Sequence, residues 1–202
     1  MYSSLPSFVL GFHGCDKQVG EKVLAGKDRL NPSQNDYDWL GNGIYFWENN
    51  PNRALDYAKE LKKYPQRVKS IIKTPFVIGA IIDLGCCLNL LDARFIDVVK
   101  TGYKLLQQTL KKSNVEMPKN KHIGTSKEPL LRNLDCAVIQ MVHQVDTTQK
   151  YDTVRGVFTE GTPLYENSGF QEKSHIQICV VNPNCIKGYF YPLDPIAAFP
   201  IP

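Results

Sequence analysis

The pattern of apolar and polar positions divides the chain into short apolar runs and longer stretches with helical spacing. Apolar runs bounded by glycine, proline or charged residues predict β-strands. Such runs occur at residues 7–13, 43–47, 75–84, 156–158, 175–181 and 186–191. Apolar residues three and four positions apart predict amphipathic helices. This spacing occurs at residues 16–25, 91–110 and 130–145, and in a segment that opens at Asn50-Pro51.

Residues at the ends of these segments agree with the assignment. Asp16 suits the N-cap of the first helix and Gly26 suits its end, because a carboxylate and a glycine are favoured at those two positions. Pro51 suits the first turn of the second helix, where its missing N–H would be unpaired in any case. The polar stretches between the segments are expected to be loops, at residues 31–42, 111–127 and 161–169.

The elements alternate without a break in composition. The chain of 202 residues contains no internal repeat, low-complexity tract or evident linker. Its length is enough to bury a substantial core. We therefore expect a mixed α+β fold in which residues 1–202 form one domain.

Composition and charge narrow the picture further. Hydrophobic residues make up 43% and charged residues 22% of the chain, as in ordinary globular proteins, and the net charge of +4 permits an anionic partner without requiring one. Neither a leader peptide nor an apolar stretch of about 18 residues is visible, so we expect a cytoplasmic protein without a membrane partner. The six cysteines include no CxxC pair, which predicts free thiols and no metal site.

Four sequence features carry polar or aromatic groups that suit a ligand site. His13-Gly14 ends the first strand, and the string Gly-Asn-Gly-Ile-Tyr-Phe-Trp at residues 41–47 feeds the second. Tyr57 lies twelve residues beyond Tyr45, in the following helix. On the late strand at residues 175–181, His175, Gln177 and Cys179 share one face. Each feature alone has an ordinary structural explanation, as a core histidine, a turn before core aromatics, or a hydrogen-bonded strand face.

The order of these features resembles that of the ADP-ribosyltransferases. The branch is that of diphtheria toxin and the poly(ADP-ribose) polymerases, which carry a His-Tyr-Glu triad. The matching motifs run from His13 to Gln177, over most of the chain. The resemblance implies an ADP-ribosyltransferase fold, in which two small antiparallel sheets flank an NAD+-binding cleft and helices pack outside.

The resemblance also implies roles for individual residues. His13 matches the histidine that bonds the adenosine-side ribose of NAD+, and Gly14 matches the glycine whose backbone holds the nicotinamide carboxamide. Tyr45 matches the triad tyrosine, and Tyr57 matches the second ring of the nicotinamide slot. Gly43, in the glycine-rich turn before Tyr45, belongs to the same NAD+-contacting set.

The third triad position departs from the family pattern. The family branch has a glutamate on the late strand, and residues 175–191 contain none, so Gln177 is the best match by position. Gln177 can orient a ribose hydroxyl but cannot act as a base. Glu160, where the family places its acceptor-recognising loop, is the candidate base, although a surface glutamate is an equally ordinary role. Arg155 is a candidate partner for the NAD+ pyrophosphate or for Glu160, and a surface salt bridge is its more common role.

The resemblance implies a mono-ADP-ribosyltransferase that uses NAD+ as substrate. The acceptor is a protein or a nucleic acid. By analogy, a single catalytic domain without a leader suits a bacterial toxin, effector or defence protein, and a toxin would have a neutralising partner protein. Two alternatives remain: an inactive NAD+- or ADP-ribose-binding module of the same fold, and an NAD+ glycohydrolase.

Overall fold

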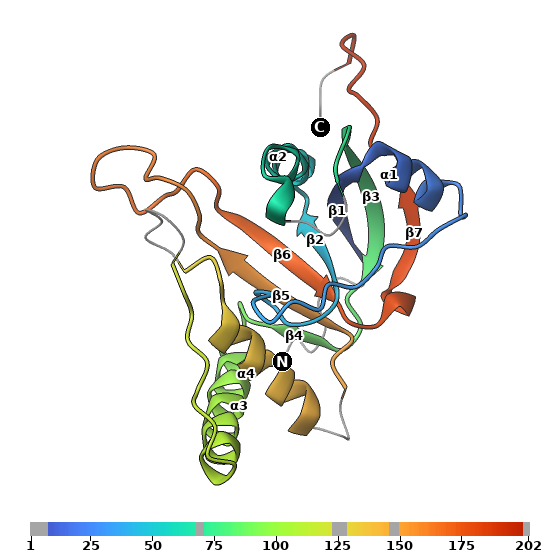
Figure 1. Cartoon of the computed structure of the whole chain (residues 1–202). Helices are drawn as coiled ribbons and strands as arrows, with labels where there is room; N and C mark the ends of the chain where they lie inside the picture. Colours follow the sequence, from blue (N-terminus) through green and yellow to red (C-terminus); the bar gives the residue numbers. More distant parts are fainter. Residues whose placement is uncertain (1–7, 68–70, 123–128, 146–149, 200–202) are drawn as a thin grey trace.

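The computed structural model describes residues 8–67, 71–122, 129–145 and 150–199 (Figure 1). Its strands are β1 Phe8–Asp16, β2 Ile44–Glu48, β3 Pro75–Asp83, β4 Cys87–Asn89, β5 Thr153–Phe158, β6 His175–Val180 and β7 Ile186–Phe190. Its helices are α1 Lys17–Leu24, α2 Pro51–Lys63, α3 Ala93–Lys112 and α4 Asn133–Val145. Single 3₁₀ turns lie at Pro65–Arg67 and Pro183–Cys185. The α+β class predicted from the sequence is confirmed.

The strands form one seven-stranded sheet in the order β4-β5-β6-β2-β1-β3-β7. The expectation of two separate antiparallel sheets is wrong in this respect, and the sheet is mixed because β4 runs parallel to β5. The halves β4-β5-β6-β2 and β1-β3-β7 are nevertheless joined through only two residue pairs, Gly11 with Glu48 and Phe12 with Trp47. By contrast, β1 pairs with β3 along its whole length. The junction between β1 and β2 is therefore the weakest line of the sheet, and we call it the seam.

The helices begin where the sequence places capping residues. Asp16 caps α1 by accepting a hydrogen bond from the N–H of Gln18, and its second oxygen accepts from Lys73 and Thr74. These bonds lower the pKa of the Asp16 carboxyl, with the Thr74 N–H as the largest cause. Asn50 caps α2, and Pro51 occupies its first turn as expected. A side-chain cap supplies one of the orphan N–H groups of the first helical turn with an acceptor.

Helices cover both faces of the sheet. Side chains alternate between the faces along each strand, so His13 and Gly14 point to opposite sides. α1 packs on the side of His13, where Gly20 lies against Ile78. α2 packs on the other side, where its Ala54 lies against Gly14. We call these sides the α1 face and the α2 face.

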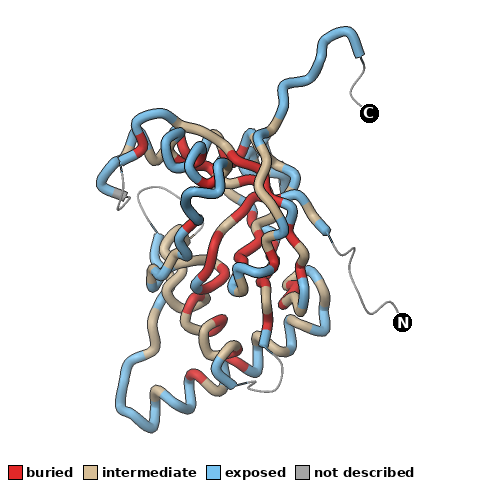
Figure 2. Tube along the Cα trace, turned by 90° about the vertical axis from the view of Figure 1, so that its right-hand side faces the viewer, coloured by how far each residue is buried: buried red, intermediate tan, exposed pale blue. Residues whose placement is uncertain are grey.

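The second half of the α2 face is covered by α4, with α3 packed beside it (Figure 1). Ile139 and Val142 of α4 join a buried cluster with Val154 of β5 and Cys179 of β6. The buried residues follow the central strands and the inner faces of the helices (Figure 2). The polar and aromatic residues discussed below lie on the α2 face of β2 and β6.

Several boundaries differ from the sequence prediction. The strand expected at residues 156–158 begins at Thr153, and β4 was not predicted, because three residues are too few to show an alternating pattern. The helix expected from residue 91 begins at Ala93, since Asp92 caps it. Ser7 and residues 123–127 of the lysine-rich loop lie outside the described residues. Within the described residues, no helix combines the length and the apolar character that a membrane span requires.

Candidate functional site

His13 lies at the seam. Beyond the Phe12–Trp47 pair the ladder between β1 and β2 ends, and the imidazole Nδ1 of His13 lies 2.8 Å from the carbonyl oxygen of Tyr45. A carbonyl oxygen only accepts, so Nδ1 carries the proton and donates this bond. Burial lowers the pKa of His13, which keeps its ring neutral at neutral pH. Nε2 is then free to accept a hydrogen bond, but His13 lies on the α1 face, on the opposite side of the sheet from Tyr45 and Tyr57.

Tyr45 points to the α2 face and its hydroxyl is fully engaged. The hydroxyl accepts a hydrogen bond from the N–H of Leu40 at 2.8 Å and donates one to the carbonyl of Gly41 at 2.7 Å. Gly41 adopts a φ of 79°, a left-handed conformation that glycine reaches without strain. Burial raises the pKa of Tyr45 well above its usual range. The hydroxyl of Tyr45 therefore holds the glycine-rich turn in place.

Gly14 and Gly43 are required by close packing. A Cβ added at Gly14 would lie 2.1 Å from the carbonyl oxygen of Ala54, so the backbone of α2 rests directly on β1. A Cβ added at Gly43 would lie 2.5 Å from the sulfur of Cys179. The two glycines thus bring α2 and β6 close to the seam, and this packing explains them without a ligand.

The ring that lies against Tyr57 belongs to Trp47. The two ring centroids are 4.9 Å apart and the planes meet at 48°. Trp47 and Tyr45 share the α2 face of β2, because they are two residues apart. Tyr57 is partly exposed, at 37% of its surface. A flat ligand that binds beside Tyr57 has to separate the ring of Tyr57 from the indole of Trp47. The sequence does not predict this contact between Tyr57 and Trp47.

Gln177 and His175 lie on the α2 face of β6. Gln177 pairs with Trp47 on one side and with Gly156 on the other. His175 is enclosed by aromatic rings, with centroids 6.0 Å from Phe158, 6.3 Å from Trp47 and 6.5 Å from Trp39. The sequence pattern correctly places both residues on one face, and Gln177 stays a candidate for orienting a ribose.

Glu160 is partly buried and paired within the protein, which differs from an ordinary surface glutamate. Its Oε2 lies 2.7 Å from Nη2 of Arg53, and the two side chains are only 16% and 9% exposed. The same oxygen lies 3.7 Å from Nδ1 of His175. Arg53 also stacks its guanidinium over Trp47, at 5.7 Å from the ring centroid. The structure therefore joins α2, the segment after β5, and β6 in one cluster, which we call the Arg53–Glu160–His175 cluster.

Arg155 has a different partner from the one expected. It forms two hydrogen bonds with Glu48, at 2.5 and 2.7 Å, and a third with Asn89 at 3.3 Å. Glu48 is the main cause that raises the pKa of Arg155. Arg155 pairs with Ile178 of β6, so it points to the α1 face, away from Glu160. The expected pairing with Glu160 and the surface salt bridge are both wrong, because Arg155 belongs to a partly buried ion pair with Glu48.

Trp47, Arg53 and His175 are the cluster residues that the sequence interpretation did not select. The sequence places His175 on the same strand face as Gln177, but the match to the family position favours Gln177. Arg53 is 8% exposed, and an arginine in the first turn of a helix gives no sign in the sequence that it is buried. Its position three residues after the N-cap Asn50 could have suggested an orientation toward the sheet.

The β5–β6 loop, residues 159–174, projects from the sheet next to this cluster (Figure 1). Backbone bonds hold it together, from Leu164 to Phe170 at 3.1 Å and from Lys173 to Glu160 at 2.9 Å. Leu164, Tyr165 and Phe170 are all exposed. The loop thus combines an ordered backbone with an apolar tip at the edge of the candidate site.

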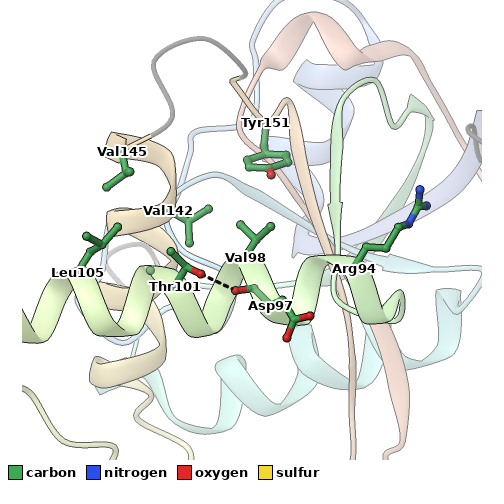
Figure 3. Close-up of a pocket in the computed structure, with 9 residues that line it drawn as sticks. Arg94, Asp97, Val98, Thr101, Leu105, Val142, Val145 and Tyr151 are labelled. Carbon is green, nitrogen blue, oxygen red and sulfur yellow. Dashed lines mark hydrogen bonds between the residues drawn. The ribbon is translucent and has the colours of Figure 1, made fainter.

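A separate cavity of about 370 Å³ opens between α3 and α4 (Figure 3). Val98, Leu105, Val142 and Val145 give it an apolar lining, and Tyr151 closes one end. It contains none of the residues singled out from the sequence. Among the described residues, no three His, Cys, Asp or Glu side chains are grouped to hold a metal ion.

The chain is similar to an uncharacterized protein of Methanocaldococcus jannaschii, MJ0359. The two are 27% identical over 200 residues, which cover 87% of this chain and 83% of that protein. No protein-family model matches the chain. No solved structure matches it significantly. The similarity extends over most of both chains, but because MJ0359 is itself uncharacterized, the similarity does not assign a function to this chain.

Proposed function

We propose that this protein is a mono-ADP-ribosyltransferase that cleaves NAD+ on the α2 face, beside Tyr57. The observation that carries the proposal is the gathering of Tyr57, Trp47, the Arg53–Glu160–His175 cluster and Gln177 between α2 and β6. Aromatic side chains together with a few convergent polar groups are the usual lining of a small-molecule site.

The chemistry of the reaction suits these residues. When the bond between C1′ of the ribose and the nicotinamide nitrogen breaks, its electron pair leaves with nicotinamide, which departs as a neutral molecule. Positive charge develops on the ribose. The site must then stack the nicotinamide ring, hold the ribose hydroxyls and offer negative charge nearby. Tyr57 and Trp47 supply aromatic surface, Gln177 supplies an amide, and Glu160 supplies the carboxylate.

The acceptor is proposed to meet the ribose from the side of the β5–β6 loop. Glu160 opens this loop, and the exposed Tyr165 and Phe170 lie farther along it. Exposed lysines on α3 and beyond provide positive charge for a nucleic-acid acceptor, at Lys111, Lys112, Lys119 and Lys121. Phosphate contacts make such transfer fall steeply with salt, whereas a protein acceptor makes it less salt-dependent. By analogy alone, the setting is that of a toxin, effector or defence protein.

One observation favours the binding-module alternative. β6 carries no carboxylate, and the only carboxylate of the described cluster is already paired with Arg53. A site in which Glu160 stays paired can bind NAD+ without splitting it. The NAD+ glycohydrolase alternative requires only that water, instead of a macromolecule, reaches the ribose.

The proposal is tested by incubating the purified chain with NAD+ labelled in the adenine part, with and without a cell lysate. Transfer is expected, so that label appears on macromolecules and nicotinamide is released. Free ADP-ribose alone indicates a glycohydrolase, and binding without turnover indicates a binding module. If the chain neither binds nor cleaves NAD+, the proposal is wrong.

A matched pair of variants ties the activity to this face. Tyr57→Ala is expected to weaken NAD+ binding by about 5-fold or more, because aromatic stacking contributes about 1 kcal/mol beyond area burial. Tyr103→Ala removes a tyrosine of similar exposure, 39% against 37%, from α3, which packs against α4. Equal effects of the two substitutions would place the NAD+ site elsewhere.

A further inference from the structure

Buried nitrogen atoms without hydrogen-bond partners gather around His175. In the described part of the chain they include Nε and Nη1 of Arg53, Nε1 of Trp47 and Nε2 of His175. The side chains of Arg53 and His175 are 9% and 0% exposed. Each unpaired buried polar group costs about 1–3 kcal/mol. Four such atoms in one cluster are unusual for a scaffold and suggest that a ligand completes the bonding.

The hydrogen-bonding character of each atom follows from the geometry. Nδ1 of His175 lies 2.5 Å from the carbonyl oxygen of Lys173, so Nδ1 carries the proton. Burial among aromatic rings is the main cause that lowers the pKa of His175, against the opposing effects of the Lys173 carbonyl and Glu160. The neutral ring therefore presents a bare lone pair at Nε2. The unpaired atoms of Arg53 and Trp47, in contrast, are N–H donors.

A hydroxyl is a ligand group that fits both kinds of atom. A phosphate or carboxylate accepts from Arg53 and Trp47 but offers no hydrogen to Nε2, and Glu160 repels it. A hydroxyl donates one hydrogen bond and accepts others. A pair of neighbouring hydroxyls, as on a ribose, satisfies the lone pair and the donors together.

We infer that Nε2 of His175 accepts a hydrogen bond from a ribose hydroxyl of NAD+, with Arg53 donating to the same diol. The inference rests on the proposed function and assigns the hydroxyl-binding position on β6 to His175 instead of Gln177. The hydroxyl keeps its proton throughout, so His175 orients the ribose and requires no proton transfer. His175 therefore contacts the substrate directly, and its partner Glu160 holds Arg53 in position.

The surroundings of His175 make this contact sensitive to acid. Glu160 from the segment after β5 and Arg53 from α2 are the charged groups that face it. The other neighbours are the rings of Trp39, Trp47 and Phe158 and the Lys173 carbonyl. Protonation converts Nε2 from an acceptor into a donor and places a second positive charge beside Arg53. NAD+ affinity is then expected to fall once His175 is protonated.

The experiment compares His175→Asn and His175→Gln with the parent, using NAD+ and an NAD+ analogue that lacks the 2′-hydroxyl of the nicotinamide ribose. The side-chain amide of asparagine can replace Nδ1, and that of glutamine can replace Nε2. Both tryptophans of the chain lie against His175, so their fluorescence reports binding directly. Circular dichroism confirms that each variant is folded.

Three results support the inference. His175→Asn weakens NAD+ binding about 10-fold or more, since a buried hydrogen bond is lost. His175→Gln retains most of the affinity. The analogue binds the parent and His175→Asn about equally, because it lacks the hydroxyl that His175 contacts.

Two other results overturn the inference while the proposed function stands. In the first, the parent binds NAD+ and His175→Asn binds it as tightly, while Gln177→Ala loses affinity. In the second, His175→Asn weakens NAD+ and the analogue by the same factor, which indicates a structural role. A parent chain that does not bind NAD+ overturns both the inference and the proposed function.

Discussion

Two partly buried ion pairs lie on opposite faces of the sheet, and they differ in how completely they are hydrogen-bonded. On the α1 face, Arg155 uses both sides of its guanidinium to bind Glu48 and Asn89. On the α2 face, Arg53 uses a single nitrogen to bind Glu160 and leaves two others without partners among the described residues. Both pairs are less than one-fifth exposed.

On the proposed function, this difference distinguishes a structural ion pair from one that takes part in ligand binding. A buried charge network that is fully bonded holds its elements rigidly, and here it joins β2, β4 and β5. A network that is only partly bonded has donors available for a ligand. We therefore assign the Glu48–Arg155 pair to stability and the Arg53–Glu160–His175 cluster to binding. The predictions below test this division, beginning with the largest effect.

Arg155→Met is expected to lower the free energy of unfolding by about 3–5 kcal/mol. The substitution keeps much of the volume and leaves the carboxylate of Glu48 buried without a partner, which is costly. Urea denaturation followed by circular dichroism measures the change. A decrease in the free energy of unfolding below about 1 kcal/mol would show that this pair does not hold the sheet together. The assignment of the Glu48–Arg155 pair to stability would then be wrong.

Arg53→Met, the same substitution on the other face, is expected to cost only about 1–2 kcal/mol. It removes the partner of Glu160, but it also removes two unpaired N–H groups that already penalise the fold. Its main effect is expected on NAD+, with affinity reduced about 10-fold or more. Titration of tryptophan fluorescence measures the binding, and denaturation measures the stability. Unchanged NAD+ affinity would assign Arg53 to the scaffold.

Tyr45→Phe is expected to cost about 1–3 kcal/mol, because it leaves the backbone N–H of Leu40 unpaired in the core. Tyr57→Phe is its control, since Tyr57 is partly exposed and its hydroxyl is not required by the core. Thermal unfolding of the two variants is the measurement. If both substitutions cost the same, the hydroxyl of Tyr45 does not hold the glycine-rich turn.

The smallest expected effect concerns acid stability. Burial lowers the pKa of His13, His143 and His175. Below about pH 6.5 the unfolded chain therefore binds more protons than the folded one, and stability falls as the pH decreases. Each histidine contributes a slope of at most about 1.4 kcal/mol per pH unit. His175→Asn should reduce the slope between about pH 6.5 and 5, which urea denaturation across this range measures. An unchanged slope would mean that His175 is charged in the folded protein.

Local sequence signals predicted the elements more fully than they predicted the contacts between them. Asp16, Pro51 and the apolar runs placed α1, α2 and most strands correctly, because capping and periodicity are properties of neighbouring residues. The two halves of the sheet are joined at the seam by two residue pairs between β1 and β2. These pairs join residues far apart in the sequence, so a pattern of neighbouring residues does not predict them.

The candidate site shows the same limit. The alternation along β6 put His175 and Gln177 on one face, and the structure agrees. Arg155 and Glu160 are separated by only five residues, but their partners, Glu48 and Arg53, are each 107 residues distant in sequence. Which arginine meets which glutamate is decided by the face of the sheet that each residue occupies. That depends on the assembled fold.

The most direct test of the account is nicotinamide release from NAD+ by the parent chain, Arg53→Met and Arg155→Met, compared at equal concentrations of folded protein. The account predicts that the parent releases nicotinamide and that Arg155→Met does so at a similar rate per folded molecule. Arg53→Met is predicted to be slower by at least about 10-fold, since it removes a donor that positions the ribose. A parent that releases no nicotinamide, or an Arg53→Met variant as fast as the parent, would contradict the account.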